Sequence, residues 1–381
     1  MATIVFGTYM VGYPLGGALS SKLQWLVGFH RLGHQVYVLD KSAGANSCYD
    51  PVRKVTSDDC SHGVAVMRDL LGRFGLDENW CFVDAAGEYH GMSRRQVRDV
   101  FAATDVYFDY GAHGLWHEDA AAAGTRVFID GEPGYRQMKM AMCGPDAAGM
   151  NTYDHYFTVG RNVGTPRSTI PTAGRTWKHV CSPVVVELFR DVPAPPADAP
   201  FTTVMNWQSH GRLEYAGTTY GQKDAEFPKF ISLPNRVDVP MEVAVSGSVP
   251  ADELRRCGWR VTRAQAATIT YDAFVQYIAR SMGEFSVCKN VFVATNSGWF
   301  SDRSGAYLAA GRPVVMQETG FSQHLPCGAG LYAVNTLDEA VDAIAAIRSD
   351  YAQHTAAARE VAKAHLDATV VLPPLLRDLG L

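Results

Sequence analysis

Three titratable residues lie at the ends of short apolar segments in the first half of the chain. His113 follows "DVYFDYGA", and Asp130 and Glu132 close "TRVFIDGE". If these segments are parallel strands, the side chains project beyond the carboxyl edge of a sheet, where ligands of such sheets bind. A carboxylate or an imidazole at that edge can act as a general base toward an attacking hydroxyl group. The structural alternative is that Asp130 caps a turn before Pro133 and that His113 is a hydrogen-bonded loop histidine.

A second feature that could do chemistry is the stretch "SGWFSDRSGAYLAAGRPVV", which begins at Ser297. Its residues 301–304 predict the start of a helix, and small residues after them keep that helix thin. The free N–H groups of a first helical turn carry about half a positive charge and suit a phosphate or pyrophosphate. Asp302 would repel a phosphate unless it turns away, pairs with Arg303 or bonds to sugar hydroxyls. Simple helix capping is the structural alternative, and the residues alone leave the ligand open.

Elements that could position these residues repeat along the first half of the chain. Residues 3–9 predict a strand, residues 18–32 a helix closed by Gly33, and residues 34–40 a second strand. Short strands are also expected at residues 105–111, 125–131 and 155–160. The first half therefore reads as a series of βαβ units around a parallel sheet.

A proline-rich run, "VPAPPADAP", separates this series from a second one. Its strands are expected at 201–207, 241–247, 259–262, 291–295, 313–317 and 330–334, followed by two helices. The predicted class is α/β, with two Rossmann-like domains facing a central cleft. The predicted boundaries are 1–190 for the first domain, 191–200 for the linker, 201–365 for the second domain, and 366–381 for a helix returning to the first.

Composition excludes several classes of function. The 381 residues are 47% hydrophobic and 19% charged, and the net charge of −5 offers no general attraction for nucleic acid or an anionic membrane. Eight cysteines without a C-x-x-C pair predict reduced, mostly buried thiols. No signal peptide or apolar run of 18 residues is present, so we expect a cytoplasmic protein without membrane insertion. The chain has no G-x-G-x-x-G motif, which argues against a nicotinamide-binding site at the N-terminus, and no G-K-[ST] sequence, so a Walker A loop is absent.

The stretch from Ser297 resembles the donor segment of GT-B nucleotide-sugar glycosyltransferases, in particular bacterial family 4-like and family 1-like enzymes. "TYGQKDAEFPKF", "VAVSGSVP" and "GFSQHLPCGAGLYAVNTLDEAVDAIAAI" extend the resemblance over most of residues 201–365. The resemblance implies a nucleoside diphosphate sugar as donor, Lys223 as a phosphate contact, and no metal or other cofactor. The donor residues implied are Lys223, Gly298, Trp299, Phe300, Ser301, Asp302, Arg303, Ser304, Glu318, Thr319 and Gly320.

The first domain would bind a small-molecule acceptor, with Tyr13, Gly16 and Gly17 of its glycine loop at that site. An inverting transfer would use Asp130 or His113 as base, whereas a retaining transfer needs mainly phosphate stabilisation. Many retaining members carry two glutamates separated by seven residues, and Gly298 and Ala306 occupy those places here. Two alternatives stay open: a nucleotide-sugar epimerase on the same scaffold, and an inert GT-B-like binding protein.

Overall fold

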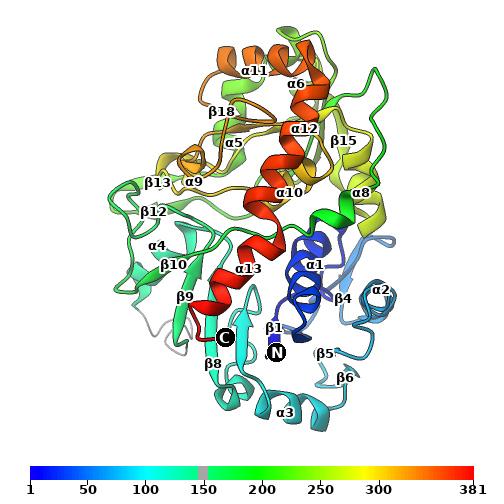
Figure 1. The fold of residues 1–381 in the computed structure, drawn as a ribbon, viewed down its shortest axis with the longest axis vertical. Coiled ribbons are helices and arrows are strands. Elements are labelled where there is room, and N and C mark those ends of the chain that lie inside the picture. Colours follow the sequence, from blue (N-terminus) through cyan, green and yellow to red (C-terminus); the bar gives the residue numbers. More distant parts are fainter. Residues whose placement is uncertain (145–152) are drawn as a thin grey trace.

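The computed structural model of this protein describes residues 1–144 and 153–381. Within these ranges the chain forms two α/β units, one above the other in Figure 1, and each unit has its own sheet and hydrophobic core. No helix in the described ranges combines the length and the apolar character needed to cross a membrane.

The first unit is built on a sheet with the strand order β10-β9-β8-β7-β1-β2-β5-β6 among the described residues. Neighbouring strands are parallel except for the antiparallel pair β5 and β6. The strands are β1 (Thr3–Gly7), β2 (Gln35–Lys41), β5 (Trp80–Val83), β6 (Tyr89–Gly91), β7 (Val106–Asp109), β8 (Thr125–Asp130), β9 (His155–Thr158) and β10 (Trp177–His179). The accompanying elements are α1 (Gly16–Arg31), α2 (Ser61–Gly72), α3 (Arg94–Ala102), α4 (Tyr135–Cys143) and the hairpin β3 (Cys48–Asp50) and β4 (Val55–Ser57).

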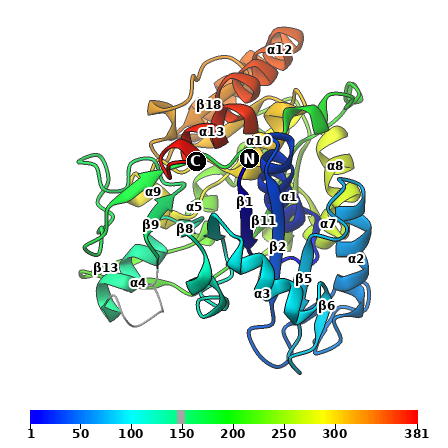
Figure 2. The ribbon, with the colours of Figure 1, turned by 60° about the horizontal axis from the view of Figure 1, so that its bottom comes forward.

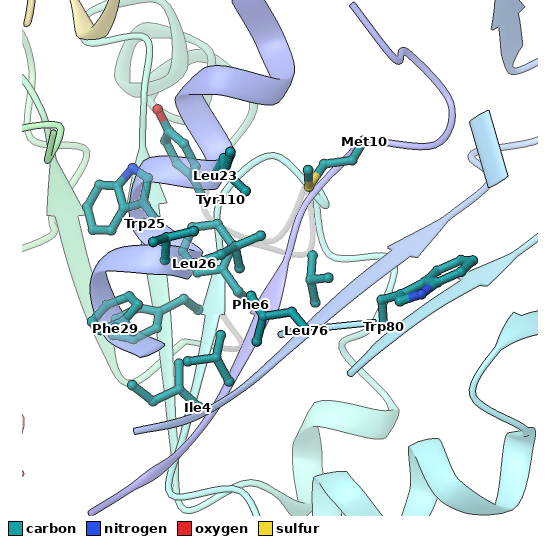
Figure 3. Close-up of a cluster of buried hydrophobic side chains, with 14 of the residues drawn as sticks. Ile4, Phe6, Met10, Leu23, Trp25, Leu26, Phe29, Leu76, Trp80 and Tyr110 are labelled. Atoms are coloured by element: carbon teal, nitrogen blue, oxygen red, sulfur yellow. The ribbon is translucent and has the colours of Figure 1, made fainter. Parts of the chain in front are cut away.

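The core of this unit shows why its first residues fold as predicted. Figure 3 shows Trp25, Leu26 and Phe29 of α1 lying against Ile4 and Phe6 of β1, and all five are fully buried. Burying each such side chain contributes roughly 1.5 to 3 kcal/mol. α1 ends where the sequence predicted, because Gly33 adopts a φ of +85° that favours glycine.

The second unit contains a wholly parallel sheet with the order β15-β14-β11-β16-β17-β18 in the described part of the chain. Its strands are β11 (Phe201–Asn206), β14 (Met241–Ser246), β15 (Arg260–Arg263), β16 (Gly283–Ser286), β17 (Val314–Gln317) and β18 (Leu331–Val334). Its helices are α5 (Lys223–Glu226), α6 (Ala251–Arg256), α7 (Ala264–Thr268), α8 (Tyr271–Ala279), α9 (Asn290–Ala294), α10 (Asp302–Ala309), α11 (Leu337–Ser349) and α12 (Tyr351–Val361). A hairpin of β12 (Leu213–Tyr215) and β13 (Thr218–Tyr220) projects from it.

One strand prediction was wrong. Residues 291–295 were expected to form a strand, but they lie in and just after the short helix α9, and the strand before the donor segment is β16. A short run of apolar residues fits a buried helix as well as a strand, so periodicity could not separate them. β16 escaped notice because its sequence "GEFS" contains a glutamate, and Glu284 is fully buried in the sheet.

The end of the chain returns to the first unit. The long path through α12 and α13 (Ala368–Arg377) runs from one unit to the other in Figure 1, and α13 lies beside α1 in Figures 1 and 2. Ala368 and Leu372 pack where a Cβ on Gly28 would stand, so this glycine permits the close approach of the two helices.

All eight cysteines are free thiols, as predicted. Only half of them are buried, however: Cys48, Cys60, Cys81 and Cys288. Cys143 and Cys327 are exposed, so the expectation of mostly buried thiols holds for only part of the set.

Candidate active site

A cavity of about 640 Å³ lies between the two units. Its walls come from loops that follow β1, β7, β8 and β9 of the first sheet and β11, β14 and β16 of the second. The strand order reverses direction at β1 in one sheet and at β11 in the other, which is where ligands of open parallel sheets bind. A more open hollow of about 800 Å³ touches Thr3 at the amino end of β1, so it lies away from these ligand-binding edges.

The cavity is positively charged although the chain is not. Among the described residues, six basic side chains line it against three carboxylates. The basic residues are Lys22, Arg136, Lys139, Lys223, Lys289 and Arg303, and the acidic ones are Asp130, Glu132 and Asp302. The whole chain carries −5. A local excess of cations in a protein with negative net charge indicates a site for an anionic ligand.

Lys223, at the start of α5, is a buried cation without an ion pair among the described residues. Only 7% of the residue is exposed, and no ion pair joins it to any carboxylate in the described ranges. Burial and the neighbouring Arg303 charge lower the pKa of Lys223 to about 7. A bound phosphate would supply the missing negative charge and favour the protonated ammonium.

Arg303 lines the same cavity, but most of its donors are already in use. Its Nε donates to the buried Glu284 carboxylate, Nη1 donates to the carbonyl of Val204 (2.8 Å), and Nη2 donates to Oγ of Ser286 (2.8 Å). The guanidinium thereby joins α10 to β11 and β16. The structure therefore gives Arg303 a positioning role beside Lys223, with two N–H groups left over.

The first turn of α10 faces the cavity, and its Ncap residue is Ser301, as the sequence predicted. In the described ranges the Ser301 hydroxyl makes no cap hydrogen bond to this turn. Asp302 accepts a hydrogen bond from the backbone N–H of Arg303 (2.8 Å). Its carboxylate also interacts with the ammonium of Lys22 from the first unit. The expected repulsion between Asp302 and a phosphate is therefore moderated by a cation.

Lys22 reaches the cavity from the second turn of α1. It is 6% exposed, and its Nζ lies 4.7 Å and 4.5 Å from the ring centroids of Tyr9 and Tyr110. Such cation–π contacts partly replace the water lost on burial. Lys22 thus supplies a second buried cation opposite the start of α10.

The three candidate bases line the cavity but differ in what their lone pairs do. Nδ1 of His113 accepts a hydrogen bond from Arg136 (2.8 Å), since a guanidinium can only donate. Burial and this charge lower the pKa of His113, so the ring is neutral and its proton sits on Nε2. In this arrangement His113 is a hydrogen-bond donor with no free lone pair.

The two carboxylates are also distinguishable. Burial alone would raise the pKa of Glu132, but His210 (3.0 Å) and Lys289 (2.6 Å) outweigh it and lower the pKa to about 2. Burial raises the pKa of Asp130, whose Oδ2 accepts from Gln137 and Thr158. Among the described residues, Oδ1 of Asp130 accepts only the N–H of Glu132, so it keeps a lone pair there. Asp130 therefore remains the stronger candidate base.

Not all of the implied donor residues reach this cavity. Trp299, Ser301, Asp302 and Arg303 line it, whereas Gly298 and Phe300 border a small separate hollow. Gly298 donates its N–H to the carbonyl of Thr319 (2.6 Å). It lies so close to the backbone of Asn162 in the first unit that a Cβ would collide there. A β-bridge between Gly160 and Trp299 also joins the units here.

Ser304 and residues 318–320 lie behind the cavity wall. Ser304 is fully buried, and its hydroxyl contacts Sδ of Met316 (3.8 Å). Glu318 accepts from the N–H groups of Thr319 (2.9 Å) and Gly320, and the Thr319 hydroxyl donates to the carbonyl of Trp299. These residues hold the donor segment in place, and none of them lines the cavity.

The glycine loop of the first unit is divided in the same way. Tyr13 and Gly17 line the cavity, and Tyr13 stacks on Tyr49. Gly16 instead lies against the second unit, where a Cβ would collide with the carbonyl of Thr270. It allows the start of α1 to approach α8 across the boundary between the units.

Sequence reasoning missed four of the six cations. Lys22 could have been noticed, because it is the one charged residue in "GGALSSKLQWLVGF". Lys289 follows β16, a strand that was not predicted. Arg136 and Lys139 lie one turn apart on α4, a spacing shared by many solvent-facing helices.

Comparisons with known proteins bear on the fold. No protein-family model matches the chain, and no curated protein sequence matches it significantly. Solved structures do match. An alpha-glucosyltransferase in complex with UDP and a 13-mer DNA shares 9% identity over 99% of both chains, with a TM-score of 0.59.

Two further structures match over almost their whole length. Anabaena HepE in complex with UDP-glucose shares 12% identity over 100% of both chains, with a TM-score of 0.57. Sucrose-phosphate synthase from Thermosynechococcus elongatus shares 12% identity over 100% of this chain and 99% of its own, with a TM-score of 0.51. These neighbours are GT-B glycosyltransferases, and the likeness spans both units. The protein described here has the GT-B fold, as the resemblance of its second half implied.

Proposed function

We propose that this protein transfers a sugar from a UDP-sugar to a small-molecule acceptor. The observation that carries the proposal is the buried Lys223, which has no ion pair in the described ranges, beside the first turn of α10 in the cleft of a GT-B fold. Structural neighbours are described with UDP or UDP-glucose bound, which favours uridine as the nucleoside.

The donor would lie with its diphosphate between Lys223 and the first turn of α10. Both elements present positive charge or N–H groups to the same side of the cavity, and Lys22 adds a cation from the opposite wall. The strand ends at Asn206 and Ser246 line the adjoining part of the cavity, where a nucleobase would be held. We propose no metal ion in the transfer, because these cations can neutralise the diphosphate.

The reaction would break the bond between the anomeric carbon and the diphosphate oxygen and form one to an acceptor hydroxyl oxygen. UDP leaves with the bonding electron pair, and Lys223 stabilises its growing negative charge. If the configuration inverts, Asp130 takes the hydroxyl proton; if it is retained, the leaving phosphate oxygen takes that proton. The free lone pair on Oδ1 supports Asp130 over His113 and Glu132.

The acceptor wall supports a small polar molecule. Arg136 and Lys139 face the cavity from α4 without a carboxylate partner in the described ranges, and His113 adds a ring N–H. These groups suit an acceptor with several hydroxyls or an anionic group. The alpha-glucosyltransferase neighbour is described with DNA, whereas the net charge of −5 argues against a duplex as the acceptor here.

The test begins with binding and ends with turnover. UDP and UDP-glucose should raise the melting temperature much more than uridine does at the same concentration, because only the phosphates meet Lys223. Incubation with UDP-glucose and a panel of sugars, sugar phosphates, hydroxy acids and duplex DNA should then release UDP only with a matching acceptor. Donor conversion without any acceptor would indicate the epimerase instead, and binding without turnover across a broad panel would indicate a binding protein. Failure of all nucleoside diphosphates to stabilise the protein would refute the donor site.

A further inference from the structure

A compact cluster of metal-ligating side chains lies in the first unit, outside the cavity. It consists of Cys60, Asp84 and His90, whose ligand atoms all lie within 4.8 Å of one another. Cys60 precedes α2, Asp84 follows β5, and His90 lies on β6. None of the three lines the cleft, so none of them would contact the substrates of the proposed transfer.

Within this cluster, hydrogen bonding pairs His90 with Asp84 and leaves the thiol of Cys60 with only a longer contact. The same nitrogen, Nε2 of His90, lies 2.9 Å from Oδ2 of Asp84 and 3.5 Å from Sγ of Cys60. A single N–H can point to only one of them, and if Nε2 is unprotonated its lone pair faces the carboxylate. A catalytic relay is also excluded, because that would need the two different ring nitrogens of the histidine. Three side chains that can each donate an electron pair to a metal thus have their ligand atoms within 4.8 Å of one another.

Two of the three separations are close to those around a tetrahedral zinc ion, and the third, between the Cys60 sulfur and an Asp84 oxygen, is within 4.8 Å. With a Zn–S bond of about 2.3 Å and Zn–N and Zn–O bonds of about 2.0 Å, a tetrahedron places S and N about 3.5 Å apart and N and O about 3.3 Å apart. The observed 3.5 Å matches the first value, and the observed 2.9 Å needs only a small widening. Thiolate, imidazole and carboxylate are all ligands that zinc accepts.

The local structure fixes two of the three ligands before any ion arrives. Oδ1 of Asp84 accepts the N–H groups of Ala86 and Glu88 (both 2.9 Å) in the β5–β6 turn, which leaves Oδ2 directed at His90. The His90 ring stacks on Phe82, its partner in the strand register. Cys60 is 8% exposed, while 32% of the His90 side chain is exposed, so solvent can supply a fourth ligand.

We propose that Cys60, Asp84 and His90 bind one zinc ion that ties the start of α2 to the β5–β6 hairpin. The thiol proton of Cys60 is released to solvent on binding. The ion would have a structural role, because α2 lies against the loop that follows β1. Gly63 of α2 packs so closely on the carbonyl of Val11 in that loop that a Cβ would collide with it. Securing α2 therefore secures the loop after β1.

The test uses Co²⁺ as a spectroscopic probe on the full-length protein after treatment with a chelator. We expect one equivalent to bind, to give a thiolate-to-cobalt absorption band in the near ultraviolet, and to be displaced by one equivalent of Zn²⁺. Zn²⁺ should also raise the melting temperature. Cys60→Ser and His90→Gln should each abolish the band, whereas Cys257→Ser, which removes a thiol of the second unit, should retain it.

Several results would overturn the site. They are no stoichiometric binding to the wild-type protein, a band that persists in Cys60→Ser, or a band lost equally in Cys257→Ser. Circular dichroism of the metal-free variants shows whether they fold. If Cys60→Ser does not fold, Asp84→Asn serves instead, because it keeps the thiol of Cys60 and an oxygen that can accept the turn N–H groups. An absorption band of unchanged intensity and an unchanged affinity for Co²⁺ in Asp84→Asn would refute the site.

Discussion

Replacing Lys223 by methionine keeps the length of the side chain and removes its charge, and the structure predicts opposite effects on stability and on ligand binding. The ordinary lysine pKa of 10.5 falls to about 7 in the fold. Holding this charge at neutral pH therefore disfavours the unliganded fold by roughly 4 kcal/mol, an order-of-magnitude value. The unfolded chain binds more protons between about pH 7 and 10.5, so the cost is full below pH 7 and disappears above 10.5.

Lys223→Met should consequently raise the melting temperature of the unliganded protein by several degrees, roughly, at neutral pH. It should also weaken the binding of UDP about 10- to 150-fold, because a charge-assisted contact to phosphate contributes roughly 1.5 to 3 kcal/mol. Calorimetric titration with UDP and thermal melts with and without ligand measure both effects.

A matched control removes an exposed lysine that does not line the cavity. Lys363→Met changes the net charge equally at an exposed position and should leave UDP affinity within about threefold of wild type. The reasoning about Lys223 is refuted if its replacement leaves UDP affinity intact, or if Lys363→Met weakens binding as much. A fall in unliganded stability of Lys223→Met would contradict the inferred cost of the buried charge.

Three other predictions follow from the same geometry. UDP-glucose has no group that titrates near neutrality, so a pH dependence of its binding reports on the protein. Its dissociation constant should rise about 30-fold between about pH 6 and 8.5, because Lys223 loses its proton over this range. Calorimetry should find no such rise in Lys223→Met. If product analysis shows inversion, Asp130→Asn should lower kcat roughly 10²- to 10⁴-fold with little change in donor affinity, and near-normal turnover would remove Asp130 as the base. Arg303→Met leaves the fully buried Glu284 without its cation and should lower the free energy of unfolding by about 3 to 5 kcal/mol in urea titrations. Adding Glu284→Gln should restore part of this loss. Unchanged stability of Arg303→Met would show that the pair does not hold α10 to the sheet.

Local patterns identified most of the framework that carries the site. The strands at β1, β2, β11, β14, β17 and β18, the glycine that ends α1 and the start of α10 after Ser301 were all predicted and are confirmed. Each depends on residues within a few positions of one another. Lys223 was singled out only through the family resemblance, and nothing local marked it as buried.

The tertiary structure decided which of the chemically suitable residues can act. The partners that restrict His113, Glu132 and Arg303 lie 23, 157 and 19 residues away in the chain. Cys60 and His90 likewise meet only because β5, β6 and α2 pack together.

The sequence by itself determined most element types, the parallel α/β class and the start of α10, because propensities, caps and hydrophobic periods are local properties. The charge state and availability of each side chain depend instead on burial and on partners brought from both units. Packing within the second unit gives Arg303 the carboxylate of Glu284, and contact between the units gives Lys289 that of Glu132. In the described ranges the same packing leaves the buried Lys223 without an ion pair.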